Sequence, residues 1–294
     1  MKILVIYGRE LDRNSAQLVE AFRKIGHKPI SASIMNLSAY IRPGGHKFFI
    51  KGRELVKPDI CFLRSLGPGT HEQINRRINV IEHLEFSGCY VINSANAFRR
   101  ARDKYATMYV LAKAGLPVPK TLVTESSLQA YKFAKKLGEF VCKPMIGSMG
   151  YGSMKFNNAD LAYNAFRLLE RINQPIYVQE YFPTLRDFRA FVIGNKLLAA
   201  ISRAAPPEEW KTNIAQGGKA EAVQLSSKMV AMAANATKAL GLEYAGVDFI
   251  ESERGPIILE VNSSPSWQAL QSATKLNVAE KLALHAVSKV GRLK

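Results

Sequence analysis

The sequence predicts an α/β protein with more than one lobe, and three features support this fold class. Short apolar runs alternate with helical stretches over the first third of the chain, which is the pattern of parallel strands joined by helices. A Pro-containing break near residue 117 is followed by short strands and a glycine-rich loop. Near the end, two apolar strands carry acidic side chains in their interiors. A length of 294 residues with 47% hydrophobic content is sufficient for two or three compact units.

Residues 1–95 are expected to form a parallel α/β lobe. A helix from Asn14 to Ile25 is closed by Gly26, a residue typical of helix ends. Helical stretches of this kind alternate with short apolar runs, which favours crossover connections and a parallel sheet. The expected strands are Lys2 to Tyr7, Pro29 to Ser33, Asp59 to Leu63 and Tyr90 to Ile92.

Residues 96–183 are expected to form a small α+β lobe. A helix from about Arg102 to Ala114 ends at Gly115, and the run from Leu116 to Pro119 is the clearest linker-like break. After this break the expected order is strand, helix, strand, glycine loop, helix and strand. A lobe of this size is suited to act as a lid over a ligand.

Residues 184–294 are expected to form a second α+β lobe. The segment from Asp187 to Ser202 predicts a hairpin that turns at Gly194-Asn195. A helix from Ser226 to Leu240 precedes an acidic hairpin over residues 246–262, and a closing helix runs from Val278 to Val290. The chain contains no internal repeats and no low-complexity tracts.

The acidic hairpin is the most specific local feature. A hairpin folded symmetrically about Arg254 places Asp248 directly opposite Glu260, and Asn262 shares the face of Glu260 because alternate strand residues point the same way. Two facing carboxylates repel each other unless a cation lies between them. Carboxylate and amide oxygens suit a hard ion such as magnesium. The alternative is a surface hairpin with scattered acids, although strand interiors usually exclude such residues.

Such an ion commonly binds the phosphates of a nucleotide, and the middle of the chain contains residues that could bind those phosphates. A buried strand from Phe140 ends at Lys143, and a loop with Gly147, Ser148, Gly150 and Gly152 follows at once. Bare backbone N–H groups can approach phosphate oxygens, while the lysine offers a positive charge. The loop matches neither GxxxxGK[ST] nor GxGxxG. Downstream, the segment from Ile176 to Phe182 predicts another strand. Backbone groups at its polar end could bind the edge of a purine, and the alternative is an ordinary buried strand without a ligand.

Taken together, the order and spacing of these residues resemble the ATP-grasp ligases. The resemblance is closest to the RimK-type branch, which adds glutamate to a carboxyl group, and it covers essentially the whole chain. The compact size and the ending Asn262 to Trp267 are similar to archaeal ligases that glutamylate tetrahydromethanopterin or the deazaflavin coenzyme. The residues that carry the resemblance are Lys104, Lys143, Gln179 to Phe182, Asp187 to Arg189, Arg203, Asn213, Asp248 and Glu260 to Pro265.

The resemblance implies an ATP-grasp architecture: an N-terminal parallel α/β lobe, a small α+β lid lobe and a C-terminal α+β lobe with the metal site. It also implies a role for each matching residue. ATP phosphates would be held by lysines and the glycine loop, the adenine by a strand end, and two magnesium ions, which manganese can replace, by the acidic hairpin. The implied nucleotide residues are Lys104, Lys143, Gly147, Ser148, Gly150, Gly152, Gln179, Glu180, Tyr181, Phe182 and, at the ribose, Asp187. Arg203 and Asn213 would contact the transferred phosphoryl group, Asp248, Glu260 and Asn262 the metal ions, and Arg189 and Ser264 the substrate.

The implied chemistry needs no protein nucleophile. An acceptor carboxylate attacks the γ-phosphate of ATP to give an acylphosphate and ADP, and a free amine then displaces phosphate to form an amide. Phosphoryl transfer asks the protein mainly for positioning and charge neutralisation, which cations, metal ligands and a closing loop supply.

The formal net charge of +17 admits three interpretations. It attracts polyanions, so nucleic acid is the runner-up partner, but no nucleic-acid-binding motif and no interleaved aromatic residues accompany the basic clusters. An acidic small-molecule acceptor together with L-glutamate explains the same charge, and so does plain solvation of the surface. Arg64 is expected to bind a substrate carboxylate, because it follows a strand at the carboxyl edge where open α/β sheets bind ligands, and the alternative is a surface ion pair. The clusters are Arg42, Lys47, Lys51, Arg53 and Lys57, and Arg99, Arg100, Arg102 and Lys104.

The remaining signals favour a cytoplasmic enzyme. The chain begins with a strand rather than a signal peptide, and no apolar run approaches the length of a membrane span. Cys61, Cys89 and Cys142 lie far apart in apolar runs and are expected to be reduced core residues. The five histidines show no metal-ligand spacing, and a homo-oligomer stays open. Trp267 either stacks on a flat heterocyclic substrate or packs inside the fold.

Overall fold

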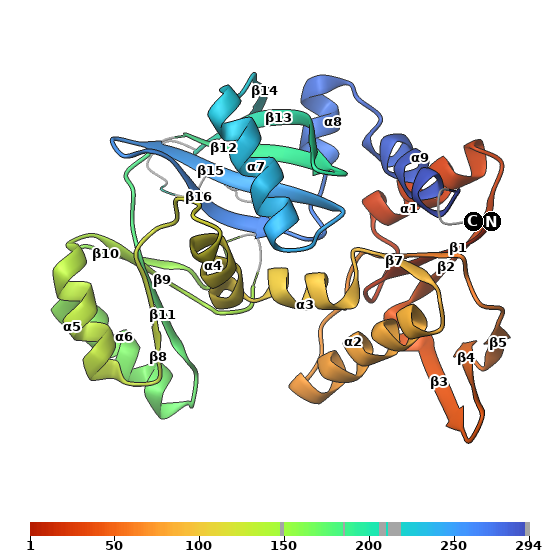
Figure 1. Cartoon of the computed structure of the whole chain (residues 1–294). Helices are drawn as coiled ribbons and strands as arrows, with labels where there is room; N and C mark the ends of the chain where they lie inside the picture. The colour runs from red at the N-terminus through yellow and green to blue at the C-terminus, as the bar shows by residue number, and fades with distance from the viewer. Residues whose placement is uncertain (148–149, 185, 206–209, 211–218, 292–294) are drawn as a thin grey trace.

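The N-terminal lobe is built on a four-stranded parallel sheet (Figure 1). In this computed structural model, which describes all residues except 148–149, 185, 206–209, 211–218 and 292–294, the strand order is β2-β1-β6-β7. Residues 3–6 of β1 are at most 1% exposed, as expected for a strand covered on both faces. The predicted parallel sheet is confirmed. Its strands are β1 (Lys2–Tyr7), β2 (Lys28–Ser33), β6 (Ile60–Leu63) and β7 (Tyr90–Ile92).

Two helices of this lobe begin at capping side chains. Helix α1 (Arg13–Lys24) starts after Asp12, whose carboxylate accepts the backbone N–H groups of Asn14 and Ser15. Helix α2 (His71–Phe86) starts with a capping box between Thr70 and Gln73. The predicted helix from Asn14 to Ile25 therefore lies within a residue of α1.

A small antiparallel sheet in the same lobe was not predicted. After the 3₁₀ turn η1 (Ile34–Asn36), the strands β3 (Leu37–Arg42), β4 (Gly45–Ile50) and β5 (Arg53–Leu55) pair in the order β3-β4-β5. Gly44 and Gly52 adopt positive φ at the two turns. The basic residues of this stretch suggested only a charged cluster, because lysine is uncommon in strands.

Two helices connect the N-terminal lobe to the rest of the molecule, where the sequence predicted one. Helices α3 (Ala95–Arg102) and α4 (Lys104–Lys113) are separated by Asp103, whose extended backbone ends α3. The Asp103 carboxylate accepts the N–H of Ala106 at 3.0 Å and so caps α4. The predicted start at Arg102 is thus corrected to Lys104, and α3 is new.

The central lobe, residues 121–180, is an antiparallel sheet with two helices on one face (Figure 1). The strand order is β10-β9-β11-β8. Phe140, Phe166 and Ile176 lie in a core made of this lobe's own residues. Strand β10, three residues long, was not predicted. The elements are β8 (Thr121–Thr124), α5 (Ser127–Leu137), β9 (Phe140–Lys143), β10 (Met154–Phe156), α6 (Ala159–Arg171) and β11 (Ile176–Glu180).

The C-terminal lobe is a five-stranded antiparallel sheet of order β14-β13-β12-β15-β16. One face packs against α7 (Ser227–Ala239), and the predicted turn at Gly194-Asn195 is confirmed, since both residues have positive φ. The strands are β12 (Arg186–Ile193), β13 (Lys196–Ala204), β14 (Lys219–Ala222), β15 (Tyr244–Ser252) and β16 (Gly255–Asn262).

The last two helices return to the N-terminal lobe. Helices α8 (Gln268–Thr274) and α9 (Val278–Gly291) follow the C-terminal sheet, and α9 packs against α1 (Figure 1). Leu282 of α9, Trp267 before α8 and Phe22 of α1 lie in one hydrophobic core. The N-terminal and C-terminal lobes therefore share a core.

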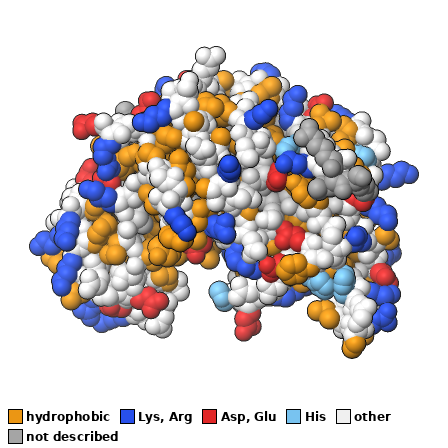
Figure 2. Space-filling model, viewed as in Figure 1, with side chains coloured by type: hydrophobic (Ala, Val, Ile, Leu, Met, Phe, Trp, Pro, Cys, Tyr) orange, Lys and Arg blue, Asp and Glu red, His pale blue; other side chains and the backbone are white. Residues whose placement is uncertain are grey.

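The prediction that the cysteines are reduced core residues is confirmed. All three cysteines are unpaired and buried, and burial raises the pKa of the Cys142 thiol to about 11 and that of Cys89 to about 12. Among the described residues, no helix is both long and apolar enough to cross a membrane. Lys and Arg side chains are spread over the face seen in Figure 2 rather than gathered in one patch, which fits a solvating role for most of them.

Candidate active site

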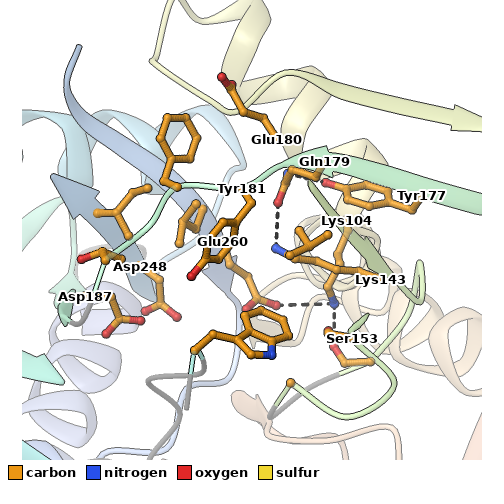
Figure 3. A pocket seen from close by; sticks show the side chains of 18 of the residues that line it. Lys104, Lys143, Ser153, Tyr177, Gln179, Glu180, Tyr181, Asp187, Asp248 and Glu260 are labelled. Carbon is orange, nitrogen blue, oxygen red and sulfur yellow. Dashed lines mark hydrogen bonds and ion pairs between the residues drawn. The ribbon is translucent and has the colours of Figure 1, made fainter. Parts of the chain in front are cut away.

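A cavity between the central sheet and the C-terminal sheet collects most of the predicted site residues (Figure 3). It contains about 1050 Å³ of space, counted to its open mouth. The predicted residues in its lining are Lys104, Lys143, Gly147, Gly150, Gln179, Glu180, Tyr181, Phe182, Asp187, Arg203, Asp248 and Glu260.

Lys143 occupies the predicted strand end and points into the cavity. Its Nζ donates to Gln179 Oε1 at 2.7 Å, and the Gln179 amide nitrogen donates to Tyr177 Oη at 2.8 Å and Thr121 Oγ1 at 3.1 Å. Burial lowers the pKa of Lys143 to about 8, although the nearby Glu260 carboxylate works in the opposite direction. The strand end thus presents a cation that is poorly solvated and ready to meet an anion.

Lys104 connects the glycine loop to the acidic strand. Its Nζ donates to the Gly147 carbonyl at 2.8 Å and lies 3.7 Å from Glu260 Oε1. Gly147 and Gly150 line the cavity, whereas Gly152, at φ +72°, packs against Pro144. Ser148 lies outside the described residues.

The predicted opposition of Asp248 and Glu260 is confirmed by the strand register. The hairpin is not symmetric about Arg254, however, because Ser252 pairs with Gly255 and the turn is one residue shorter. A bulge between Phe249 and Asp248 accommodates Leu259 as an extra residue and restores the expected register. The side chain of Leu259 consequently lines the cavity.

Arginines neutralise the acidic face. Arg189 donates two hydrogen bonds to Asp248 at 2.7 and 2.6 Å, and Arg203 pairs in the same bidentate way with Asp187 at 2.7 and 2.6 Å. Arg203 Nη2 also lies 3.1 Å from Asp248 Oδ2. Burial raises the pKa of Asp248, but the charges and hydrogen bonds of the two arginines outweigh it and hold the pKa below the ordinary value. Burial lowers the pKa of Arg203, and the two carboxylates more than reverse this, so it stays charged.

The acidic hairpin also fits a hard cation. The repulsion between Asp248 and Glu260 that the sequence suggested is already relieved by arginine and lysine, so repulsion alone does not call for a metal. Glu260 keeps ligating capacity, with 35% of its side chain exposed and Lys104 3.7 Å away. The buried Nδ2 of Asn262 has no hydrogen-bond partner among the described residues, and a rotation of this amide would present its oxygen instead. No cluster of three or more His, Cys, Asp or Glu side chains suited to a metal occurs in the described part of the chain, so a cation here needs amide and phosphate oxygens as well.

Tyr181 and Phe182 line the cavity together with aliphatic side chains such as Ile250. Glu180 does not point freely into it: its carboxylate accepts from the Lys120 N–H at 3.1 Å and from Arg254 at 2.8 Å. The sequence missed much of this lining, although Ile250 lies two residues beyond Asp248 on the same strand face and was readable from that spacing. The missed lining residues are Val141, Pro144, Tyr151, Ser153, Tyr177, Thr184, Trp210, Ile250 and Leu259.

Arg64 and Ser264 lie at the contact between lobes rather than in the lining. Arg64 is 5% exposed, donates to Tyr244 Oη at 2.7 Å and to the Pro265 carbonyl at 3.2 Å, and stacks on the Trp267 ring at 4.4 Å. Ser264 donates to the Arg64 carbonyl at 2.5 Å. A surface ion pair for Arg64 is therefore wrong, because its guanidinium is buried where the two lobes meet, and its contact with a substrate carboxylate stays a prediction.

Trp267 and Arg189, two further residues predicted from the sequence, lie outside the cavity lining. Trp267 is fully buried and its indole N–H donates to Gln17 Oε1 at 2.8 Å, so the packed role is confirmed and stacking on a substrate is wrong. Arg189 reaches Asp248 from β12 but is not part of the lining. Asn213 lies outside the described residues.

Comparison of the sequence with known proteins shows the family to which the chain belongs. The RimK-like ATP-grasp domain matches residues 101–286. The tetrahydromethanopterin:alpha-L-glutamate ligase of Methanocaldococcus jannaschii is 37% identical over 231 residues, 76% of this chain and 77% of that protein. A probable alpha-L-glutamate ligase of Legionella pneumophila (strain Corby) is 37% identical over 207 residues, 69% of this chain and 68% of that protein.

The fold comparison agrees. The structure of the ATP-grasp ligase PsnB with a phosphomimetic variant of its minimal precursor, Mg and ADP superposes with a TM-score of 0.79, covering 98% of both chains at 22% identity. The predicted ATP-grasp architecture is therefore confirmed. ATP-grasp ligases use ATP and Mg²⁺ to form amide bonds with release of ADP, and the lysines and acidic hairpin of the cavity suit that chemistry. The chain belongs to the RimK-like ATP-grasp family of ADP-forming ligases.

Proposed function

We propose that this ligase joins the amine of L-glutamate to a carboxyl group of a pterin-type or deazaflavin coenzyme. The observation that carries the ligase chemistry is the meeting of Lys143 and Lys104 with Asp248 and Glu260 in one cavity (Figure 3). The names of the relatives support glutamate as the amine substrate, and the archaeal relative supports a pterin acceptor. The alternative acceptors are a protein C-terminus and an amino-group carrier protein.

Each side chain has a defined task in this proposal. Lys143 and Lys104 neutralise the ATP phosphates from the central lobe and from the start of α4, and Tyr181 and Phe182 flank the adenine. Two magnesium ions, which manganese can replace, would neutralise the phosphoryl oxygens when held by Asp248, Glu260 and Asn262. Arg203 stays charged beside Asp248 and is placed to stabilise the phosphoryl group as it moves.

The acceptor is tested by product analysis. Purified protein is incubated with ATP, Mg²⁺, L-glutamate and one acceptor at a time: tetrahydromethanopterin, a deazaflavin coenzyme or a carrier protein. The expected product gains a glutamyl residue while ADP and phosphate are released, and mass spectrometry with an ADP assay detects both. Modification of a carrier protein alone would overturn the coenzyme acceptor and keep the ligase chemistry.

The metal site is tested by Glu260→Gln. Removing this charge weakens cation binding and the neutralisation of phosphoryl oxygens, so we expect turnover to fall by roughly 100-fold or more, since such electrostatic groups contribute on that scale. Glu251→Gln, an exposed acid on the same hairpin outside the cavity, is the matched control and should keep full activity. Wild-type turnover by Glu260→Gln at ordinary Mg²⁺ concentration would rule out the assignment of Glu260 as a metal ligand.

A further inference from the structure

Helix α3 lies between the two lobes and ends beside the active site. Phe98 packs in the core of the N-terminal lobe, whereas Ala97 packs in the core of the C-terminal lobe. The helix contacts α2 on one side and β16, the strand of Glu260, on the other. In Figure 1 it bridges the gap between the lobes, and Figure 2 shows this face of the molecule hollowed between the central and N-terminal lobes.

Three arginines occupy the last turn of α3, and two of them have partners. Arg99 lies 3.7 Å from Glu82 and donates to Asn96 at 3.0 Å. Arg100 donates to the Leu240 carbonyl at 3.4 Å. Arg102 is partly buried, yet its guanidinium has no hydrogen-bond or ion-pair partner among the residues that the structure describes. Burying a cation without a partner costs free energy, because the charge loses hydrogen bonds to water and gains none from the protein.

The surroundings of Arg102 make it more electropositive still. Arg77 of α2 is buried and donates to the carbonyls of Leu66 and Pro68 at 2.7 Å each, which fixes the loop after β6. This loop lies at the carboxyl edge of the parallel sheet, where open α/β sheets bind ligands. Burial and the positive charge of Arg77 lower the pKa of Arg102. An anion placed here would therefore relieve both the desolvation and the repulsion.

The position of Arg102 relative to the reaction follows from the chain. Arg102 and Lys104 are two residues apart, so their Cα atoms lie within about 7.6 Å of each other. Lys104 in turn lies 3.7 Å from Glu260. Arg102 does not line the cavity in which Lys143 and Lys104 lie and would face the phosphates of ATP. An anion bound by Arg102 would therefore lie near the cavity but outside its lining.

We propose that Arg102 binds a carboxylate of one of the two carboxylate-bearing substrates, L-glutamate or the acceptor, at the junction of α3 with the loop after β6. This inference rests on the proposed function. A guanidinium matches a carboxylate through two parallel N–H···O bonds, a geometry that lysine does not provide. Binding of that carboxylate between the lobes also explains why an arginine is kept unpaired at this place.

The test compares Arg102→Met and Arg102→Lys with Arg99→Met, a change of the same kind on the same helix turn. Loss of a charge-assisted pair is expected to raise the KM for one carboxylate substrate roughly tenfold to hundredfold, with the KM for ATP unchanged. Arg102→Lys should recover part of the affinity, and Arg99→Met should behave as wild type. A rise confined to glutamate identifies the amine substrate as the ligand of Arg102, and a rise confined to the acceptor identifies the acceptor.

Two results would overturn the proposal. One is an unchanged KM for both carboxylate substrates in Arg102→Met, and the other is an equal rise for all three substrates including ATP. If the wild-type protein forms no glutamylated product, the proposed function fails, and binding still tests Arg102 by itself. Calorimetric titration of L-glutamate and of glutarate, with Mg²⁺ and ADP present, should then show tighter binding to wild type than to Arg102→Met. Equal binding, or none, would contradict a carboxylate site at Arg102.

Discussion

Lys143 has its charge in a poorly solvated part of the active site, and this makes it sensitive to pH. Its Nζ contacts one neutral acceptor, Gln179, while Glu260 supplies a more distant negative charge. Burial therefore brings its pKa down to about 8, below the ordinary value of a lysine. ATP phosphates would act in the opposite direction, because an anion favours the protonated form.

We expect nucleotide affinity to depend on the protonation of Lys143. Below pH 7 the free protein already holds the charged amine, so binding involves no proton uptake by this group. Above pH 8 the free protein holds the neutral amine and must take up a proton on binding, so affinity falls as pH rises, by up to about tenfold per pH unit. Titration calorimetry of ADP between pH 6.5 and 9.5, in two buffers of different ionisation enthalpy, measures both affinity and proton uptake.

The control for this prediction is Lys143→Met. This variant should bind ADP more weakly at pH 7 and should lose the proton uptake above pH 8, because the titrating amine is gone. The same proton uptake in wild type and Lys143→Met would show that another group titrates.

At the scale of elements, one face of strand β12 carries charged residues near the site and then an apolar residue of the core. Asp187 lines the cavity and Arg189 donates to Asp248, whereas Phe191, two residues on, lies in the core shared with the N-terminal lobe. The register pairs Asp187 with Arg203 of β13 and Arg189 with Asp248 of β15. Four charged side chains of three strands thus form one buried network, which holds Asp248 in a fixed orientation.

Asp187→Asn is expected to destabilise the protein by about 3 kcal/mol, because it leaves the buried Arg203 with one weaker partner. The control is Glu54→Gln, which breaks the exposed pair of Lys47 and Glu54 at 2.8 Å and should cost less than about 1 kcal/mol. Urea unfolding followed by circular dichroism measures both differences. A loss below 1 kcal/mol in Asp187→Asn would show that the network contributes little to stability.

Local patterns predicted elements better than they predicted contacts. The two acidic strands and the lysine at the end of β9 were readable because each depends on residues close in sequence. The network of Asp187 and Arg203 was not readable, because it depends on the register of strands from distant segments. Leu259 lines the cavity because of a bulge that no spacing rule indicates. The burial of Arg64 was not readable either, because a segment that covers it lies 200 residues away. The proposed lobe boundaries at residues 95 and 183 stay a prediction.

At the scale of the whole molecule, the central lobe has a hydrophobic core of its own, whereas the N-terminal and C-terminal lobes share one. The core of the central lobe contains only residues of that lobe, such as Phe166. The core around Phe22 and Val5 contains Leu282 of α9 and Phe191 of β12, so the N-terminal lobe is completed by the end of the chain. We expect the N-terminal and C-terminal lobes to open together and the central lobe to open separately.

Two truncations of buried side chains test this division. Leu282→Ala removes methyl groups from the shared core and should destabilise it by about 2–5 kcal/mol, as such cavities do. Because Leu282 packs with residues of the N-terminal lobe, hydrogen exchange should become faster in α1 and β6 as well as in α9. Phe166→Ala should instead accelerate exchange in α5, α6 and β9 and leave α1 protected. Hydrogen exchange with mass spectrometry separates the two patterns, and faster exchange of α1 in Phe166→Ala would show that the three lobes unfold as one unit.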